Sequence, residues 1–348
     1  MFFLIVITFS NLTHAQFTSI PDANFEQELI NLGYDTGSPN GTVLTANINT
    51  ITSLDVDFKN ISDLTGIEDF SALTSLWCQS NLLTNLNVSQ NTSLINLSCH
   101  LNQITSLDIT QNTALTFLRC QFNLLTSLDV TQNTALTFLD VLHNQITSLD
   151  LSQNTVLEEL ICFENQLSSL DLTQNIVLTA LTCKSNLLNS LDLSQNTSLT
   201  WLDFANNQLT CLNLKNGNNS NLTLYNGIGN PNLTCIEVDN VPYSNTNWTN
   251  IDAQTSFSTN CPSSCSTVGL NEYHHSNFNI YPNPALEQLT IDTELAIRNV
   301  SILDITGKII TMTSQQSKLI DVVDLPSGIY FIKVITEEET MTKKFMKQ

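Results

Sequence analysis

Few side chains of this sequence have the types and the spacing that catalysis needs. The chain contains no GxSxG, no HExxH and no glycine-rich phosphate loop. Asp140 and Glu159 are expected on neighbouring strands, where two carboxylates would resemble the acid pair of a glycosidase. A sheet rich in acids produces such pairs by chance. We therefore expect no enzyme and no cofactor, and a polysaccharide-acting enzyme is only the third and weakest alternative.

Five of the nine cysteines recur at multiples of 21 residues. Val141 and Phe204 take the same place in other copies, which is typical of a core position. These cysteines form no CxxC pair and have no histidine at zinc spacing, so no metal site is expected. The set comprises Cys78, Cys99, Cys120, Cys162 and Cys183.

An aspartate also recurs every 21 residues, and it forms an acidic column. Carboxylates on adjacent coils lie about 4.8 Å apart and repel one another. We favour a solvated acidic edge bonded to nearby Ser and Thr, while a Ca²⁺ or Mg²⁺ ladder stays open. The column comprises Asp108, Asp129, Asp150, Asp171 and Asp192.

The charge balance restricts the partners. Lys and Arg number 11 against 32 Asp and Glu, giving a formal charge of -21 although charged residues are only 12% of the 348. Residues 1–275 hold 4 basic and 23 acidic side chains, so the basic residues concentrate in the last 73. The shortage of Lys and Arg argues against nucleic-acid binding and against anionic membrane surfaces. A hydrophobic fraction of 41% is too high for a disordered acidic tail.

The elements that position these residues follow a strict period of 21. The pattern L-x-x-L-x-C-x-x-N-x-L returns without an insertion, which indicates a solenoid whose coils bury their apolar faces by stacking. Alternation at Leu118, Arg119 and Cys120 predicts a short strand with Arg119 outward. The second half of each copy imitates the first, so we expect a parallel sheet opposite an extended, partly β-like wall.

The repeated pattern resembles the leucine-rich repeat of the short bacterial class over about residues 49–240. The resemblance implies a solenoid with parallel short strands and little helix. It also implies that a recurring asparagine forms an internal ladder bonded to the backbone, which suits an amide with two donors and one acceptor. That asparagine occurs as Asn81, Asn102, Asn123, Asn144, Asn165, Asn186 and Asn207.

Some outward columns on the strand side vary from copy to copy, whereas the S-L-D-[VIL]-[ST]-Q-N-T half hardly changes. Aromatic and charged residues in variable columns are typical of interface anchors, and they also suit sugar rings. We predict that this face binds a protein or a glycan. The alternative is a structural, ice-contacting or surface-contacting solenoid without a discrete ligand. The predicted binding residues are Trp77, Phe117, Arg119, Phe138, Asp140, Glu159, Phe163, Trp201 and Asp203.

The first fifteen residues are typical of a signal peptide. An apolar run over residues 2–7 precedes Thr13 and Ala15, and cleavage is expected before Gln16. Further along, residues 21–33 predict a short amphipathic helix that begins near Asp22 and ends at Gly33. No segment reaches the length of about 18 apolar residues that a membrane helix needs, so none is expected in the mature chain.

Because an exported protein reaches an oxidising compartment, we expect the four remaining cysteines to form disulfides. Cys211 and Cys235 occupy equivalent places in adjacent coils, and Cys261 and Cys265 follow at the end of the repeats. We favour the pairs 211 with 235 and 261 with 265, and the other two connectivities stay open.

Residues 278–348 lack the repeat and predict six or seven short alternating strands in a small antiparallel β-sandwich. Its motif residues are Tyr281, Pro282, Asn283, Pro284, Gly307, Lys308, Gly328, Ile329, Tyr330, Lys343 and Lys344. With these residues the segment resembles the C-terminal sorting domain of type IX secretion. The alternative is an ordinary adhesive β-sandwich that stays in place. The resemblance implies contact with the secretion machinery and export through the periplasm. It implies that the product is released or attached to the outer-membrane surface.

The expected organisation has five parts. They are a signal peptide at 1–15, an N-terminal cap at 16–48, the solenoid at 49–240, a C-terminal cap and linker at 241–277, and the sorting domain at 278–348.

Overall fold

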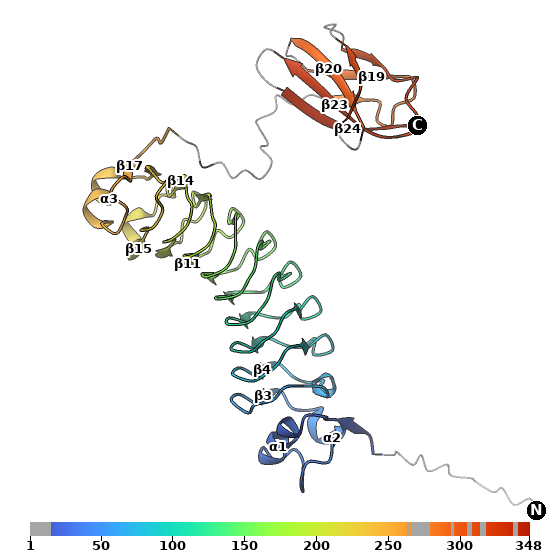
Figure 1. Cartoon of the computed structure of the whole chain (residues 1–348), viewed down its shortest axis with the longest axis vertical. Coiled ribbons are helices and arrows are strands. Elements are labelled where there is room, and N and C mark those ends of the chain that lie inside the picture. Colours follow the sequence, from blue (N-terminus) through green and yellow to red (C-terminus); the bar gives the residue numbers. More distant parts are fainter. Residues whose placement is uncertain are drawn as a thin grey trace, which may run out of the picture. The chain divides into compact units, whose positions relative to one another are not determined.

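The structure is a computed structural model that describes residues 15–262, 265, 279–293, 296–304, 308–313, 318–336 and 340–348 (Figure 1). The chain divides into two compact units, Met1–Thr267 and Val268–Gln348. Residues 1–14 of the predicted signal peptide and Gly307 of the predicted sorting residues lie outside the described residues.

A small cap precedes the coils of the first unit. Strand β1 (Phe17–Ser19) pairs antiparallel with β2 (Thr42–Leu44), and the helices are α1 (Ala23–Asn31) and α2 (Thr45–Ile48). The Asp22 carboxylate accepts hydrogen bonds from the first turn of α1, and Gly33 follows the helix with a φ of 81°. Phe25 is fully buried, with its ring 6.3 Å from that of Phe70. The predicted helix is thus confirmed, and its apolar face covers the first coils.

One wall of the solenoid is a nine-stranded parallel sheet with one three-residue strand per coil (Figure 1). The central leucines align between coils, as in Leu118 opposite Leu139, and they are fully buried. The residues on either side of each leucine therefore point outward, as the alternation predicts. In spatial order the strands are β3 (Ser53–Asp55), β4 (Ser75–Trp77), β6 (Asn96–Ser98), β8 (Phe117–Arg119), β9 (Phe138–Asp140), β10 (Glu159–Ile161), β11 (Ala180–Thr182), β13 (Trp201–Asp203) and β15 (Leu224–Asn226).

The opposite wall is only partly β-structured. It contains a two-stranded sheet near the N-terminal end and a four-stranded parallel sheet near the C-terminal end, with extended chain between them. These strands are β5 (Leu86–Asn87), β7 (Leu107–Asp108), β12 (Ser190–Asp192), β14 (Cys211–Asn213), β16 (Cys235–Glu237) and β17 (Ser256–Ser258). Short helices η1 (Ile67–Asp69), η2 (Asn219–Asn221) and α3 (Val241–Asn247) complete the unit. The expected solenoid with little helix is confirmed.

Two asparagine columns run through the solenoid. Asn123 represents the predicted ladder: its Oδ1 accepts from Ile104 N–H at 2.9 Å, and its Nδ2 donates to two carbonyls. The second column begins at Asn91, and the sequence pattern alone showed it only as the marker of the period. In Asn133, Nδ2 donates to the carbonyls of Ile109 and Asn112 at 2.9 Å, but Oδ1 has no hydrogen-bond partner among the described residues.

The five cysteines of the core column are free and fully buried, as their exchange with Val141 and Phe204 predicts. Burial raises the pKa of each thiol, for example that of Cys162 to about 12. Thiols in this state are poor metal ligands and poor nucleophiles.

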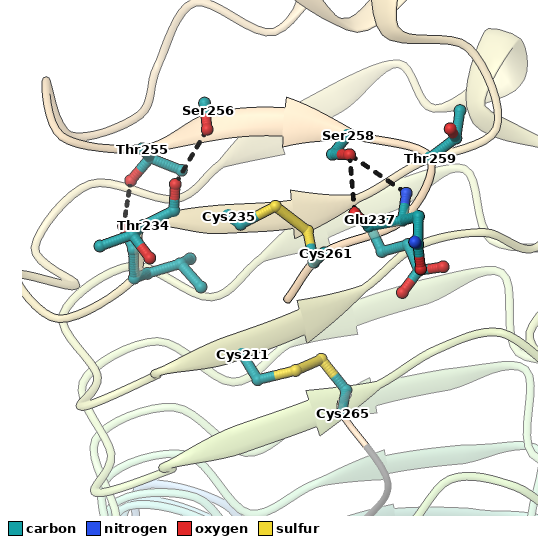
Figure 2. The surroundings of a disulfide bond; sticks show 12 residues. Cys211, Thr234, Cys235, Glu237, Thr255, Ser256, Ser258, Thr259, Cys261 and Cys265 are labelled. Carbon is teal, nitrogen blue, oxygen red and sulfur yellow. Dashed lines mark hydrogen bonds between the residues drawn. A yellow bond between two sulfur atoms is a disulfide. The ribbon is translucent and has the colours of Figure 1, made fainter. Parts of the chain in front are cut away.

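The favoured disulfide pairing is wrong. The bonds join Cys211 to Cys265 and Cys235 to Cys261, with Cα–Cα distances of 5.3 and 5.9 Å. Cys211 and Cys235 begin the neighbouring parallel strands β14 and β16, so their Cβ atoms point the same way and not toward each other. Figure 2 shows the two bonds side by side, each leaving its strand toward the chain that follows β17.

The second unit consists of two antiparallel sheets with a core of their own. The three-stranded sheet has the order β18-β19-β22, and the four-stranded sheet has the order β21-β20-β23-β24. Both contribute to one core, with Leu289 and Ile291 from the first and Val300, Ile332 and Phe345 from the second. The strands are β18 (Asn279–Tyr281), β19 (Gln288–Asp292), β20 (Ile297–Leu303), β21 (Ile309–Thr313), β22 (Leu319–Asp321), β23 (Gly328–Thr336) and β24 (Thr340–Lys347).

Candidate binding face

We call the outward side of the nine-stranded sheet the strand face. Eight of the nine predicted binding residues are the first or third residue of a strand whose middle leucine is buried, and Phe163 follows β10 by two residues. All nine therefore belong to this face. Trp201 is 46% exposed and Asp140 only 5%, while the other seven are half-buried.

An aromatic cluster lies on the part of the strand face that runs from β4 across β6 to β8 and β9. It comprises Trp77, Phe117, Phe138 and Arg119. The Phe117 and Phe138 rings stack at 4.7 Å because their strands are in register, and Trp77 lies 6.1 Å from Phe117. The Arg119 guanidinium carbon lies 5.1 and 5.2 Å from the two phenyl centroids. Its position over both rings is that of a cation–π contact, which fixes a long side chain on the surface.

The aromatic residues Phe163 and Trp201 lie apart from the aromatic cluster, so the predicted aromatic side chains do not form one continuous apolar strip. Lys184 Nζ lies 4.5 Å from the Phe163 centroid, and a hollow of about 310 Å³ lies between Glu159 and Trp201. Within the described chain, no ring contact joins Phe163 or Trp201 to the aromatic cluster. Lys184 was missed as a candidate, although it stands in an outward column with Phe163.

The electrostatics of the strand face centre on Asp140. Burial raises the pKa of Asp140 to about 6, against the Leu142 N–H bond and the Arg119 charge, which lower it. Burial, and then the Arg119 charge, lower the pKa of His100, so this imidazole is biased toward its neutral form. Glu159 pairs in register with Phe138 and not with Asp140, so strand pairing does not place the two acids directly opposite each other.

The acidic column on the opposite wall serves the local backbone. Asp129 Oδ1 accepts hydrogen bonds from the N–H and the hydroxyl of Thr131, at 2.9 and 2.7 Å. The hydroxyl bond, followed by the N–H bond, lowers the pKa of Asp129. Asp108 and Asp171 make the same pair of bonds to the threonines two residues on. The part of the chain that the structure describes has no group of three or more His, Cys, Asp or Glu arranged to hold a metal ion.

In the second unit, several of the predicted sorting residues hold the strands together. Asn283 Oδ1 accepts from Met346 N–H at 2.9 Å, which ties the turn after β18 to β24. Tyr330 is buried, donates its hydroxyl to Pro326 O at 2.9 Å and lies 5.8 Å from the Phe345 ring. Lys308, Lys343 and Lys344 are exposed.

Residues 279–348 match the model of the secretion system C-terminal sorting domain. The second unit is a C-terminal sorting domain. It contains the matched residues, and its two antiparallel sheets confirm the predicted sandwich. The sorting domain implies type IX export of this chain to the cell surface or into the medium. None of the described helices is long and apolar enough to cross a membrane.

The solenoid is similar to known leucine-rich repeat proteins. Internalin J of Listeria monocytogenes is 41% identical over 72 residues, which is 21% of this chain and 8% of that protein. The functional domain of InlJ, which includes a cysteine ladder, is 24% identical with a TM-score of 0.40, covering 97% of this chain and 100% of that one. A leucine-rich repeat protein of Leptospira interrogans is 21% identical with a TM-score of 0.43, covering 62% of each chain. The assignment of leucine-rich repeats to this chain depends on its 21-residue period and its coil geometry, and not on these TM-scores.

Proposed function

We propose that this exported leucine-rich repeat protein binds a protein or glycan ligand through its strand face. The observation that carries the proposal is the aromatic cluster, in which Arg119 lies across two stacked phenyl rings at the outer surface of a sheet. Aromatic side chains and arginine are the residue types enriched among interface anchors. Phenylalanine is not a general feature of this column, because the positions equivalent to Phe117 and Phe138 hold Ser75, Asn96 and Ala180 in other coils.

The second unit supports the proposal that binding takes place after export. A sorting domain implies the type IX secretion machinery as a partner during export. We propose that the solenoid is the cargo that functions after export, either released or attached at the outer surface. The absence of enzymatic activity, of a cofactor and of nucleic-acid binding stays a prediction.

Removing aromatic side chains from the strand face, in the aromatic cluster and at Trp201, tests the proposal. Phe117→Ala with Phe138→Ala, and separately Trp201→Ala, should leave folding intact because small residues occupy equivalent positions in other coils. The matched control is Phe17→Ala, which removes a phenyl ring that is 61% exposed and belongs to β1 of the N-terminal cap, not to the nine-stranded sheet. Binding is measured on a glycan array and by capture of partners from the native environment.

The proposal expects both strand-face variants to lose capture while the control retains it. Equal capture by all variants would reject the strand face as the binding site. Failure of the unmodified protein to capture anything would favour the alternative of a structural or surface-contacting solenoid without a discrete ligand.

A further inference from the structure

The hollow on the strand face results from one small side chain between two large ones. Glu159, Ala180 and Trp201 are in register on the consecutive strands β10, β11 and β13. Two strand spacings separate Glu159 from Trp201, which is about 10 Å. Because Ala180 has only a methyl group, the space above it stays open, and Ile161 and Thr182 contribute to its lining.

The two sides of this hollow offer different chemistry. Trp201 is 46% exposed and makes no ring contact within the described chain, so its indole is available to a ligand. The Glu159 carboxylate is half-buried, and the structure gives it no hydrogen bond or ion pair among the residues described. An unpaired carboxylate beside an open indole is an arrangement that favours a cation.

The surrounding charges favour the same sign of ligand. Asp203, in the third position of β13, adds a carboxylate next to Thr182 on β11. The nearest cations on the face, Arg119 and Lys184, already lie over phenyl rings. Residues 16–265 hold 22 acidic and 4 basic side chains, so an anionic ligand would be repelled and a basic one attracted.

The lining of the hollow also favours a basic side chain over a sugar as the ligand. Ala180, Ile161 and the indole are apolar, and Thr182 supplies the only hydroxyl. Apart from the Thr182 hydroxyl and the Glu159 carboxylate, the side chains of this lining offer a sugar ring few partners, and hydroxyl groups buried without partners cost free energy. The methylene stem of Lys or Arg suits the apolar lining, while its charged end reaches a carboxylate.

We infer that this hollow accepts a Lys or Arg side chain of a protein partner, with the stem on Ala180 and the cation between Trp201 and Glu159. The inference rests on the proposed function of the strand face and specifies the class of its ligand. The chain has three tryptophans, which give separate indole N–H signals for the hollow (Trp201), the aromatic cluster (Trp77) and the buried C-terminal cap (Trp248).

The test is an NMR titration of the ¹⁵N-labelled full chain at low salt. One probe is a capped Gly-Ser heptapeptide with a central arginine, and its matched control carries citrulline, which has the same shape without the charge. The arginine peptide should shift the Trp201 signal in a saturable way, and citrulline should bind about tenfold more weakly, the size expected of a cation–π contact with a partly shielded ion pair.

Three variants locate the binding. Glu159→Gln should weaken the arginine peptide by several-fold, whereas Glu158→Gln removes the same charge one residue earlier, outside the hollow, and should change binding less than twofold. Ala180→Phe should abolish the Trp201 shift by filling the hollow. The same column already holds Phe117 and Phe138, so this variant is expected to fold.

Several results would overturn the inference. They are equal binding of the citrulline peptide, equal effects of Glu158→Gln and Glu159→Gln, or a Trp201 signal that the arginine peptide does not move. If methyl glucoside shifted the Trp201 signal at a lower concentration than the arginine peptide does, the hollow would be assigned to a glycan. A shift of Trp77 alone would reject the hollow but support the strand face, so the two proposals fail separately.

Discussion

Replacing Asn123 by Ala should destabilise the solenoid much more than replacing Asn133 by Ala, although both side chains are buried amides. Without Asn123, the buried N–H of Ile104 has no acceptor, which costs about 1–3 kcal/mol. Two further hydrogen bonds, to Cys99 O and Cys120 O, are lost at about 1 kcal/mol each. The expected loss of unfolding free energy is therefore about 3–5 kcal/mol.

The hydrogen bonds lost with Asn133 are of a different kind. Its Nδ2 donates to Ile109 O and Asn112 O, and each of these carbonyls keeps a backbone N–H donor, so the replacement leaves no buried acceptor unpaired. Replacement also removes the unpaired Oδ1, whose burial already costs about 1–3 kcal/mol. The gain nearly offsets the two lost bonds, and the net loss should be about 1 kcal/mol or less. These values count hydrogen bonding alone; the volume removed is the same in both variants, so the cavity adds a similar cost to each and leaves the difference between them unchanged.

Urea unfolding of the full chain, followed by circular dichroism and tryptophan fluorescence, measures both losses. Hydrogen exchange at Ile104 supplies a local readout, because only Asn123→Ala should accelerate exchange of that N–H. Equal destabilisation of the two variants, or protection of Ile104 that survives Asn123→Ala, would refute the reasoning.

Further predictions concern charge, disulfides, cations and export. Asp140 has a folded-state pKa raised to about 6, so its contribution to stability is present below pH 4 and is lost as the pH rises through 6; Asp140→Asn should flatten this dependence in thermal melts. Peptide mapping without reduction should link Cys211 to Cys265, and a peptide linking Cys211 to Cys235 would contradict the fold. Melting with and without EDTA should give the same midpoint, because the carboxylates of the acidic column already bond to their own turns; a lower midpoint with EDTA would indicate a bound cation. Deletion of residues 276–348 should trap the chain in the periplasm, and normal secretion without them would reject the sorting domain as the export signal.

The strict period made much of the fold predictable. A strand of three residues with one buried leucine follows from the alternation around Leu118, and the outward place of Phe117 and Arg119 follows with it. The period also predicts which residues share a column, because coils of equal length stack in register. The role of Asn133 could not be predicted in this way, since a recurring polar residue does not reveal whether its acceptor is bonded.

The sequence by itself determined the coil, its buried leucines, its outward columns and the sorting domain, because each depends on contacts that repeat at a fixed spacing or on a local motif. The tertiary structure decided the disulfide pairs, because they depend on the path of the chain after β17, which no repeat specifies. It also decided that the outward residues form an aromatic cluster and a separate hollow. The volume between Glu159 and Trp201 depends on the size and the direction of side chains on three adjacent strands, and a column of letters does not contain that information.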